Sequence, residues 1–316
     1  MENRFDLNDG TIGNTNSASY KGTKGSNQKE FEGAANVGIA GPFGTLRAGR
    51  VNQLVKDAQA TFDPFHQIDV ATQFYGLQRA PRIDNTLRYD SPKFGDFEFG
   101  ASYSLGVNTN KKTVSSTPLG TSGASPADVK AAGADNDGYE AALRYNNGTI
   151  YGAVSWGRLA DSNDSKVWGV GLGWRITPDV AVTLQYEDND SRGAHGQRDN
   201  NLSADSAGLW GRQKNWLVGL DWKLGPGVLK ASAQYDSLKN VGRGLNSEGK
   251  EDATHWDGKK KAKRLGLGYQ YNLSKRTSLY GNIAYTKYDD ENVAKYWTGQ
   301  DNDKSTAYQV GITHRF

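Results

Sequence analysis

The sequence predicts an all-β protein: a membrane-spanning, antiparallel up-and-down β-barrel that forms a single domain over residues 1–316. Three observations indicate this fold. Apolar and polar residues alternate with a period of two along nearly the whole chain. The alternating segments are joined in turn by short connections and by connections that are mostly long and polar. One face of each segment is aliphatic with aromatic ends, whereas the other face is polar or glycine.

The composition narrows the class of protein. The 316 residues carry 38 Lys and Arg against 35 Asp and Glu, and this near balance (net charge +3) argues against nucleic-acid binding. No apolar run approaches the roughly 20 residues that a membrane-spanning helix needs. The chain has no cysteine, which excludes disulfides and thiolate sites. Its 39 Gly, 16 Tyr and 8 Trp favour β-structure rich in glycine and aromatic residues.

The individual strands follow from the alternation. In the last of them, Tyr308, Val310 and Ile312 share one face, and Gln309 and Gly311 share the other. This is typical of a strand that is apolar on one side only. The chain contains fourteen such segments, at residues 2–9, 33–40, 44–50, 85–91, 96–106, 138–146, 149–159, 166–176, 179–188, 214–224, 227–237, 261–272, 276–288 and 305–316.

The connections differ in length in a regular way. Short ones have turn chemistry, as in Asn146–Gly148 and Gly225–Gly227. Every second connection is long and polar, except the short one at 160–165. This pattern predicts hairpins with tight turns at one rim of the sheet and long loops at the other. The long connections are 10–32, 51–84, 107–137, 189–213, 238–260 and 289–304.

The number of strands decides which way the apolar face points. A soluble barrel hides that face inside, and about eight strands give an interior that side chains can fill. Fourteen or more strands leave too wide a lumen, so we expect the apolar residues to face outward. Outward aliphatics between aromatic ends, with a polar interior, are typical of an outer-membrane barrel. A soluble sandwich or solenoid fits the chain less well.

Several segments resemble a known family. They are Asn36–Gly41 with Gly44–Arg50, Asn85–Pro92, Leu265–Tyr280 (LGLGYQYNLSKRTSLY) and Val310–Phe316. They resemble the general porins of β-proteobacterial outer membranes, the Neisseria, Burkholderia and Comamonas group. The resemblance implies a Gram-negative outer-membrane location, 16 strands in the full protein, a homotrimer, and a third long loop that folds into the lumen as a constriction.

The sequence departs from this family in two places. The family's mature chains begin with two further strands, so we expect strands to be missing before residue 1, although a barrel of 14 strands that closes on itself remains an alternative. Related chains often carry an arginine near the start of the fourth strand, where this chain reads Glu32-Gly33-Ala34. The missing cation puts a strong anion preference in doubt.

The resemblance makes residues 51–84 the constriction loop. In a narrow aqueous passage, carboxylates on a loop that face basic groups on the wall create a transverse field that selects among ions. The alternation along each strand places the side chains of six basic wall residues inward. Arg50 falls on the outward face, unless a β-bulge turns its side chain inward. A plain solvated role remains open for every one of these charges. The candidates are Asp57, Asp63, His66, Asp69, Arg79 and Arg82 on the loop, and Arg47, Arg50, Arg88, Arg144, Arg175, Lys230 and Arg264 on the wall.

Three further patterns bear on function. Gly169, Gly171 and Gly173 share one strand face, which indicates either space in the lumen or close packing between subunits. Basic residues between Lys259 and Arg264 lie at a loop–strand junction, where they could contact anionic lipid headgroups or water. The four histidines are dispersed and lie beside no nucleophile signature, so we expect no catalytic or metal site.

The C-terminus resembles an assembly signal. Val310 and Ile312 alternate toward the terminal aromatic Phe316, in the pattern by which the barrel-assembly machinery accepts such chains. The simpler alternative is that these residues are the last outward side chains at the membrane rim.

Together these features predict a passive, water-filled porin for ions and small hydrophilic solutes, with weak selectivity. We expect no cofactor and no enzymatic turnover. We expect a homotrimer that contacts outer-membrane lipid and lipopolysaccharide. A substrate-selective channel is the alternative, and an outer-membrane adhesin or enzyme is a weaker one.

Overall fold

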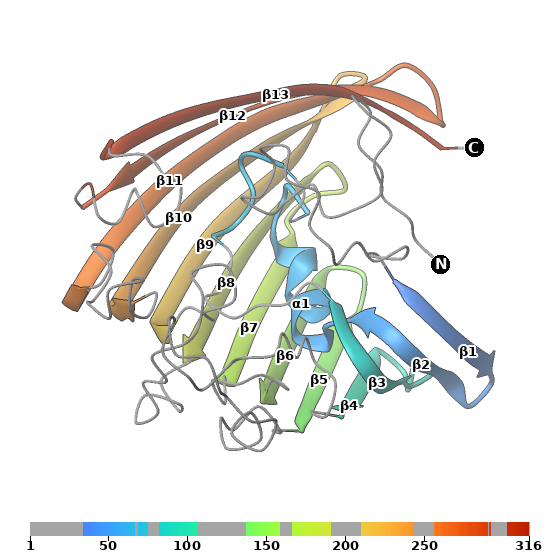
Figure 1. Ribbon diagram of the computed structural model, residues 1–316. Coiled ribbons are helices and arrows are strands. Elements are labelled where there is room, and N and C mark those ends of the chain that lie inside the picture. Colours follow the sequence, from blue (N-terminus) through green and yellow to red (C-terminus); the bar gives the residue numbers. More distant parts are fainter. Residues whose placement is uncertain are drawn as a thin grey trace, which may run out of the picture.

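The computed structural model describes residues 34–66, 69–74, 82–105, 137–158, 166–190, 210–242, 256–289, 291 and 302–315. These residues form one antiparallel sheet of 13 strands, in which each strand pairs with its neighbours in sequence. Figure 1 shows the sheet strongly curved, with helix α1 on its concave side and β1 and β13 at its two edges. The elements are β1 (Ala35–Gly41), β2 (Gly44–Asn52), α1 (Leu54–Gln59), the 3-10 turn η1 (Ala60–Phe62), β3 (Arg82–Asp90), β4 (Phe97–Ser104), β5 (Gly138–Asn146), β6 (Ile150–Arg158), β7 (Lys166–Arg175), β8 (Val180–Asp190), β9 (Trp210–Leu224), β10 (Gly227–Gly242), β11 (Trp256–Asn272), β12 (Thr277–Tyr288) and β13 (Lys304–His314).

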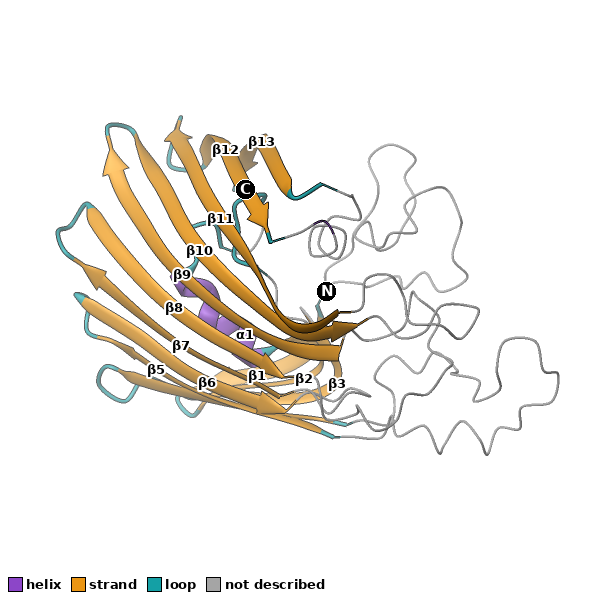
Figure 2. Ribbon diagram, turned by 90° about the vertical axis from the view of Figure 1, so that its left-hand side faces the viewer, coloured by secondary structure: helices purple, strands orange, loops and turns teal. Residues whose placement is uncertain are grey.

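The predicted all-β, up-and-down topology is confirmed. The expected strand at 2–9 lies outside the described residues, and among the described strands no ladder joins β13 to β1. The full count of 16 strands therefore stays a prediction. Figure 2 shows the tight turns together at one end of the strands. Two of these turns use glycine in the left-handed region, Gly148 (φ 91°) and Gly225 (φ 59°), where other residues would be strained.

Strands β9, β10 and β11 extend further toward the rim of the long connections than the alternation predicts. Lys239 of β10 pairs in register with Arg212 of β9 and with Lys259 of β11. The apolar alternation ends several residues earlier, because only the part of a strand within the membrane needs an apolar face. Backbone pairing continues beyond it, and hydrophobic periodicity cannot reveal that part. No helix within the described residues is long and apolar enough to cross a membrane.

The outward face is an apolar belt between two sets of aromatic side chains. Val310 and Val37 are 84% and 77% exposed there. Toward the long connections, the rings of Tyr186 and Trp216 lie 4.4 Å apart between centroids. Toward the tight turns, the rings of Phe97 and Tyr145 lie 4.9 Å apart. An exposed aliphatic band with aromatic borders is what a membrane-spanning barrel presents to lipid.

The interior is organised around a segment that leaves β2 and lies against the concave face. We call its described residues, 53–66 and 69–74, the inward segment. Among the described residues, the largest apolar cluster of buried side chains joins this segment to the wall. Its members are Leu54, Ala58, Phe62, Ala142, Tyr151 and Ala153.

Candidate functional site

The wall holds the start of the inward segment by capping its helix. The carboxylate of Glu140, on β5, accepts hydrogen bonds from the backbone N–H groups of Leu54 (3.0 Å) and Val55 (3.2 Å). It also accepts one from the hydroxyl of Ser102 on β4 (3.0 Å). The first N–H groups of a helix have no partner within the helix, and a carboxylate also favours the positive end of the helix dipole. Glu140 therefore fixes the point at which α1 begins against the wall.

Glycines in the wall make room for the inward segment. A Cβ atom at Gly169 would lie 2.8 Å from the side chain of Gln59, and one at Gly171 would overlap the ring of Phe62. The same holds further along, at Gly219 beneath Pro64 and at Gly266 beneath Ala71, 2.6 and 2.8 Å from the nearest side-chain atoms of those residues. These glycines thus give space on the lumen side, which is one of the two interpretations that the sequence left open.

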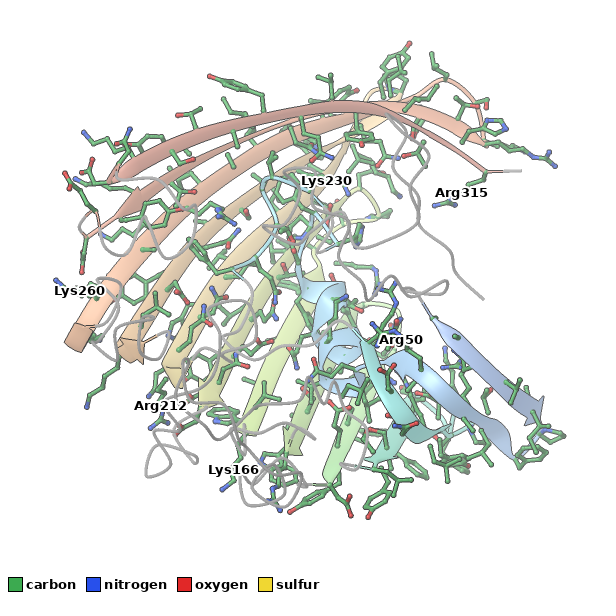
Figure 3. The ribbon with its side chains drawn as sticks, in the orientation of Figure 1. Arg50, Lys166, Arg212, Lys230, Lys260 and Arg315 are labelled. Carbon is green, nitrogen blue, oxygen red and sulfur yellow. The ribbon has the colours of Figure 1, made fainter. Side chains whose placement is uncertain are left out.

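The second half of the inward segment is held by polar contacts. Asp63 is fully buried, and its carboxylate accepts hydrogen bonds from the backbone N–H groups of Phe65 and Gln73 (both 3.0 Å) and from the hydroxyl of Thr72 (2.5 Å). Lys230 Nζ, on β10, donates to the Pro64 carbonyl (2.7 Å). Figure 3 shows Lys230 on the concave side of the sheet. The structure thus places Asp63 in contacts within the segment itself.

Asp69 joins the far end of the segment to the last two strands. Its carboxylate accepts hydrogen bonds from the Ala71 N–H (2.8 Å) and from Asn282 Nδ2 on β12 (3.0 Å), and the Val70 N–H donates to Gln309 Oε1 on β13 (3.1 Å). The pKa of Asp69 is raised to about 6, mainly by burial and also by the neighbouring Asp63, against the lowering effects of the Ala71 hydrogen bond and of Lys230 and Arg264. The inward segment thus follows the wall from β2 to β13.

Arg264 supports the same end of the segment from β11. Its guanidinium lies 4.2 Å from the centre of the Phe74 ring and donates to the Thr72 carbonyl (2.8 Å). His66 is exposed, with a left-handed backbone (φ 52°). Arg264 also donates from Nε to the Thr286 hydroxyl on β12 (3.0 Å), so it joins the segment to the wall.

A network of charges lies where the inward segment leaves the wall. Arg88 Nη1 lies 2.6 Å from Asp57 Oδ2, and its Nη2 lies 2.9 Å from Asp90 Oδ1. Arg47 and Arg144 also approach Asp90, at 3.2 and 3.7 Å. The network lines a cavity of about 720 Å³. The lining residues are Ala34, Asn36, Thr45, Arg47, Val51, Asn52, Asp57, Arg88, Asp90, Ser91, Glu98 and Arg144.

The charges of this network nearly cancel. Arg144 also pairs with Glu98 (3.1 Å), so three guanidinium groups face the three carboxylates of Asp57, Asp90 and Glu98. The side chains differ in their contact with water, because that of Arg47 is 40% exposed whereas that of Arg88 is 5% exposed. Arg47 is therefore the most exposed guanidinium of this network.

The remaining candidate residues lie elsewhere. Arg50 is opposite Ala35 in the register with β1, next to the irregularity between Gly49 and Val51, and it pairs with Asp84 (2.6 Å). Arg175 lies over the ring of Tyr151 (4.3 Å) and donates to the Gly148 carbonyl at the turn rim. Arg82 begins β3, Val310 and Ile312 face outward from β13, and Arg79 and Phe316 lie outside the described residues.

Glu140, Asp90 and Glu98 were not among the residues predicted from the sequence, although Glu140 holds the segment and Asp90 and Glu98 pair with arginines. The alternation of the strands could have identified two of them. Asp90 lies on the same inward face of β3 as Arg88, and Glu98 lies on the same inward face of β4 as Gly100. Within the described residues, no group of three or more histidines and carboxylates is placed to hold a metal ion.

The curved sheet thus combines an apolar exterior with a charged interior that the inward segment lines. The sequence profile of the Gram-negative porins matches residues 2–291. The chain belongs to the Gram-negative porin family. Porins are channels of the outer membrane, and this porin therefore lies there and acts as a passive diffusion channel, as the sequence predicted.

Relatives and solved structures agree with this assignment. An outer membrane porin protein of Bordetella pertussis is 28% identical, over 94% of this chain and 75% of that protein. Outer membrane porin protein 32 of Delftia acidovorans is also 28% identical, over 90% and 74%. The anion-selective porin from Comamonas acidovorans has the same fold, with a TM-score of 0.56, 21% identity and coverage of 89% and 77%. OmpT of Vibrio cholerae, in a trimer form, has a TM-score of 0.50, with 13% identity and coverage of 88% and 78%.

Proposed function

We propose that the inward segment narrows the channel and that the charge network around Arg88 sets the electric field beside it. The observation that carries this proposal is the position of the segment, which contacts the inner wall from β4 to β13 and so takes up space in the lumen along much of its circumference. Asp57 belongs to the segment and Arg88 to the wall, so opposite charges face each other across their junction. A field of this kind acts on ions in a narrow aqueous passage.

The selectivity of such a channel is weak. The three arginines and three carboxylates of the network cancel formally, and the exposed fractions of Arg47 (40%), Glu98 (31%) and Asp57 (30%) are similar. An ion therefore meets both signs of charge at comparable accessibility. The porin from Comamonas acidovorans is named anion-selective. For this chain we expect only a small preference, which depends on Arg47.

The channel acts without cofactor or catalytic turnover, and as a homotrimer. OmpT of Vibrio cholerae, which has the same fold, is known in a trimer form. The outward residues of β1 and β2 also support contact with protein, because within these two strands Val37, Ile39, Leu46 and Ala48 are followed by no outward Trp or Tyr toward the long connections. Strands β5–β9 instead carry Trp and Tyr toward the long connections, as lipid-facing strands do. The barrel-assembly machinery would meet Val310, Ile312 and Phe316.

The test is single-channel conductance in a planar bilayer, with a salt gradient to give the reversal potential. We expect the conductance to change in groups of three equal steps, one for each channel of a trimer, and the current to be linear in salt concentration. Arg47→Gln should change the reversal potential in the direction of greater cation selectivity. Asp57→Asn should change it in the direction of greater anion selectivity. Lys223→Gln, at the turn rim, is the matched control and should leave the potential unchanged.

Three outcomes would contradict the proposal. If neither Arg47→Gln nor Asp57→Asn moved the reversal potential, the network would not lie on the ion path. Current that saturates with one solute would favour a substrate-selective channel. Openings in single steps would argue against the trimer.

A further inference from the structure

A row of polar side chains lies buried on the inward face of β8, β9 and β10, toward the long connections. Figure 1 shows these strands next to one another in the sheet. Glu187 of β8 is directly opposite Asn215 of β9, and Asn215 is directly opposite Asp236 of β10. These residues are 1%, 2% and 0% exposed, respectively. An amide thus lies between two buried carboxylates.

Two further amides border this row. Gln185 lies two residues before Glu187, and Gln213 lies two residues before Asn215, so both share the inward face, and both are fully buried. Gln213 Nε2 donates a hydrogen bond to Asp236 Oδ1 (2.9 Å). We call these five residues, Gln185, Glu187, Gln213, Asn215 and Asp236, the oxygen cluster.

Several oxygen atoms of the oxygen cluster have no hydrogen-bond partner, although they are buried. They are Asp236 Oδ2, Asn215 Oδ1, Gln213 Oε1 and Gln185 Oε1. Buried polar atoms in native proteins are nearly always hydrogen-bonded, and a bound ion is one explanation of an exception. Oxygen atoms gathered in this way favour a ligand that interacts with acceptors, which a cation does.

The charge of Asp236 supports the same conclusion. A buried carboxylate is costly unless it is paired or coordinates a metal. Among the described residues, no ion pair includes Asp236. Arg264 of β11 is directly opposite Gln234, two residues from Asp236, but its guanidinium donates to Thr72 and Thr286. Its hydrogen bonds therefore do not reach the carboxylate of Asp236.

The kinds of oxygen in the cluster indicate which cation would bind. The cluster has two carboxylates and no histidine, so amide oxygens are needed to complete a metal site. Ca²⁺ takes carboxylate and amide oxygens in a flexible arrangement, whereas Mg²⁺ requires near-ideal octahedral geometry and keeps several waters. Zinc and copper prefer imidazole and thiolate ligands. Two carboxylates also balance the charge of a divalent ion.

We propose that the oxygen cluster binds a calcium ion on the inner wall of the barrel. Glu187, Asn215 and Asp236 supply the central oxygens, and Gln185 and Gln213 supply those at the border. Water molecules that complete the coordination of the ion accept hydrogen bonds from the amide nitrogens of Gln185 and Asn215, which also have no partner. The ion joins three neighbouring strands on the side that faces the cell exterior.

The first test measures binding of CaCl₂ to the full chain, folded in detergent, by isothermal titration calorimetry. We expect one ion per chain with a Kd of about 10⁻⁴–10⁻³ M, as in extracellular calcium modules. Asp236→Asn removes one carboxylate and should bind about tenfold more weakly. The matched control is Asp221→Asn, which removes an inward carboxylate of β9 outside the oxygen cluster and should bind as the unchanged chain does.

The second test adds a carboxylate and so reverses the expected direction. Asn215→Asp places like charges directly opposite one another on three strands, which is destabilising without a cation. Thermal unfolding in detergent with EGTA should therefore give a lower midpoint for this variant than for the unchanged chain. CaCl₂ should restore the midpoint, and the variant should bind Ca²⁺ about tenfold more tightly, because affinity rises with the number of charged ligands.

Several results would overturn the proposal. Equal binding by the unchanged chain and Asp236→Asn would place the ion elsewhere, and an absence of binding at about 10 mM CaCl₂, well above this Kd range, would exclude the site. Failure of CaCl₂ to restore Asn215→Asp would show that the added carboxylate meets no cation. Equal affinity for MgCl₂ would indicate unselective attraction of divalent ions. The reversal potentials of Arg47→Gln and Asp57→Asn are measured without calcium, so these failures are distinct from failure of the channel proposal.

Discussion

The two halves of the inward segment are held to the same wall by different forces. In residues 53–62, Leu54, Ala58 and Phe62 pack against Ala142, Tyr151 and Ala153 of β5 and β6, and Glu140 caps α1. In residues 63–74 a smaller apolar cluster of Phe65 and Ala71 with Ala284 is joined by a set of hydrogen bonds through Asp63, Asp69 and their partners on β10–β13. The first half therefore depends mainly on apolar burial and fit, whereas the second half depends more on hydrogen bonds that include an ionisable group.

This difference teaches how a segment can cross a wet interior. Near β5 and β6, the small inward residues Ala142 and Ala153 leave room for an apolar cluster whose side chains are buried. Near β10–β13, polar wall residues such as Gln234 and Asn282 offer hydrogen bonds to the backbone and side chains of the segment. A perturbation of shape should thus disturb the first half most, and a perturbation of charge the second half.

The largest effect should come from filling the space beneath η1. Gly171→Ala places a Cβ where the Phe62 ring lies, and overpacking of this kind costs about 1–3 kcal/mol of unfolding free energy. Gly266→Ala, under the second half, should cost less, about 1 kcal/mol, because its Cβ would lie 2.8 Å from Ala71 Cβ and Ser232 Oγ and would not overlap a ring. Urea unfolding in detergent micelles measures both.

Gly281→Ala is the matched strand control, because its Cβ would meet its nearest atom at 3.9 Å. It should leave the unfolding free energy unchanged or slightly higher. Equal losses at Gly171 and Gly266 would show that the two halves do not differ in their dependence on shape.

A smaller effect should follow from removing the cap of α1. Glu140→Ala leaves the N–H groups of Leu54 and Val55 and the Ser102 hydroxyl without their acceptor, which we expect to cost about 2 kcal/mol of unfolding free energy. Glu98→Ala, which removes a carboxylate from the exposed side of the charge network, should cost less than half as much. Thermal unfolding of both variants checks this, and a Glu140→Ala variant as stable as the unchanged chain would mean that burial alone positions α1.

The sequence predicts the sheet well and the inward segment poorly, for a physical reason. In a strand, side chains alternate between two faces, so apolar and polar residues alternate in the sequence. This alternation locates the thirteen strands and predicts that Arg47, Arg88 and Arg144 face inward. The inward segment has no such period, and its partners lie up to 239 residues away, as in the contact between Val70 and Gln309. Which carboxylates meet which donors therefore depends on tertiary packing. The roles of the charged residues in conduction stay predictions.

The smallest effect concerns pH and the second half alone. The pKa of Asp69 is raised from 3.8 to about 6, so between these values the folded protein holds a proton that the unfolded chain releases. The contribution of Asp69 to the unfolding free energy is therefore greatest below pH 4 and is lost as the pH rises through 6. Because Asp69 is partly exposed, we expect a loss of about 1 kcal/mol and not the full value of the shift.

Asp69→Asn cannot ionise, so the unfolding free energy of the unchanged chain minus that of the variant should fall by this amount between pH 4 and 7. A constant difference across this range would mean that Asp69 does not titrate within it. The second half would then be held as independently of pH as the first.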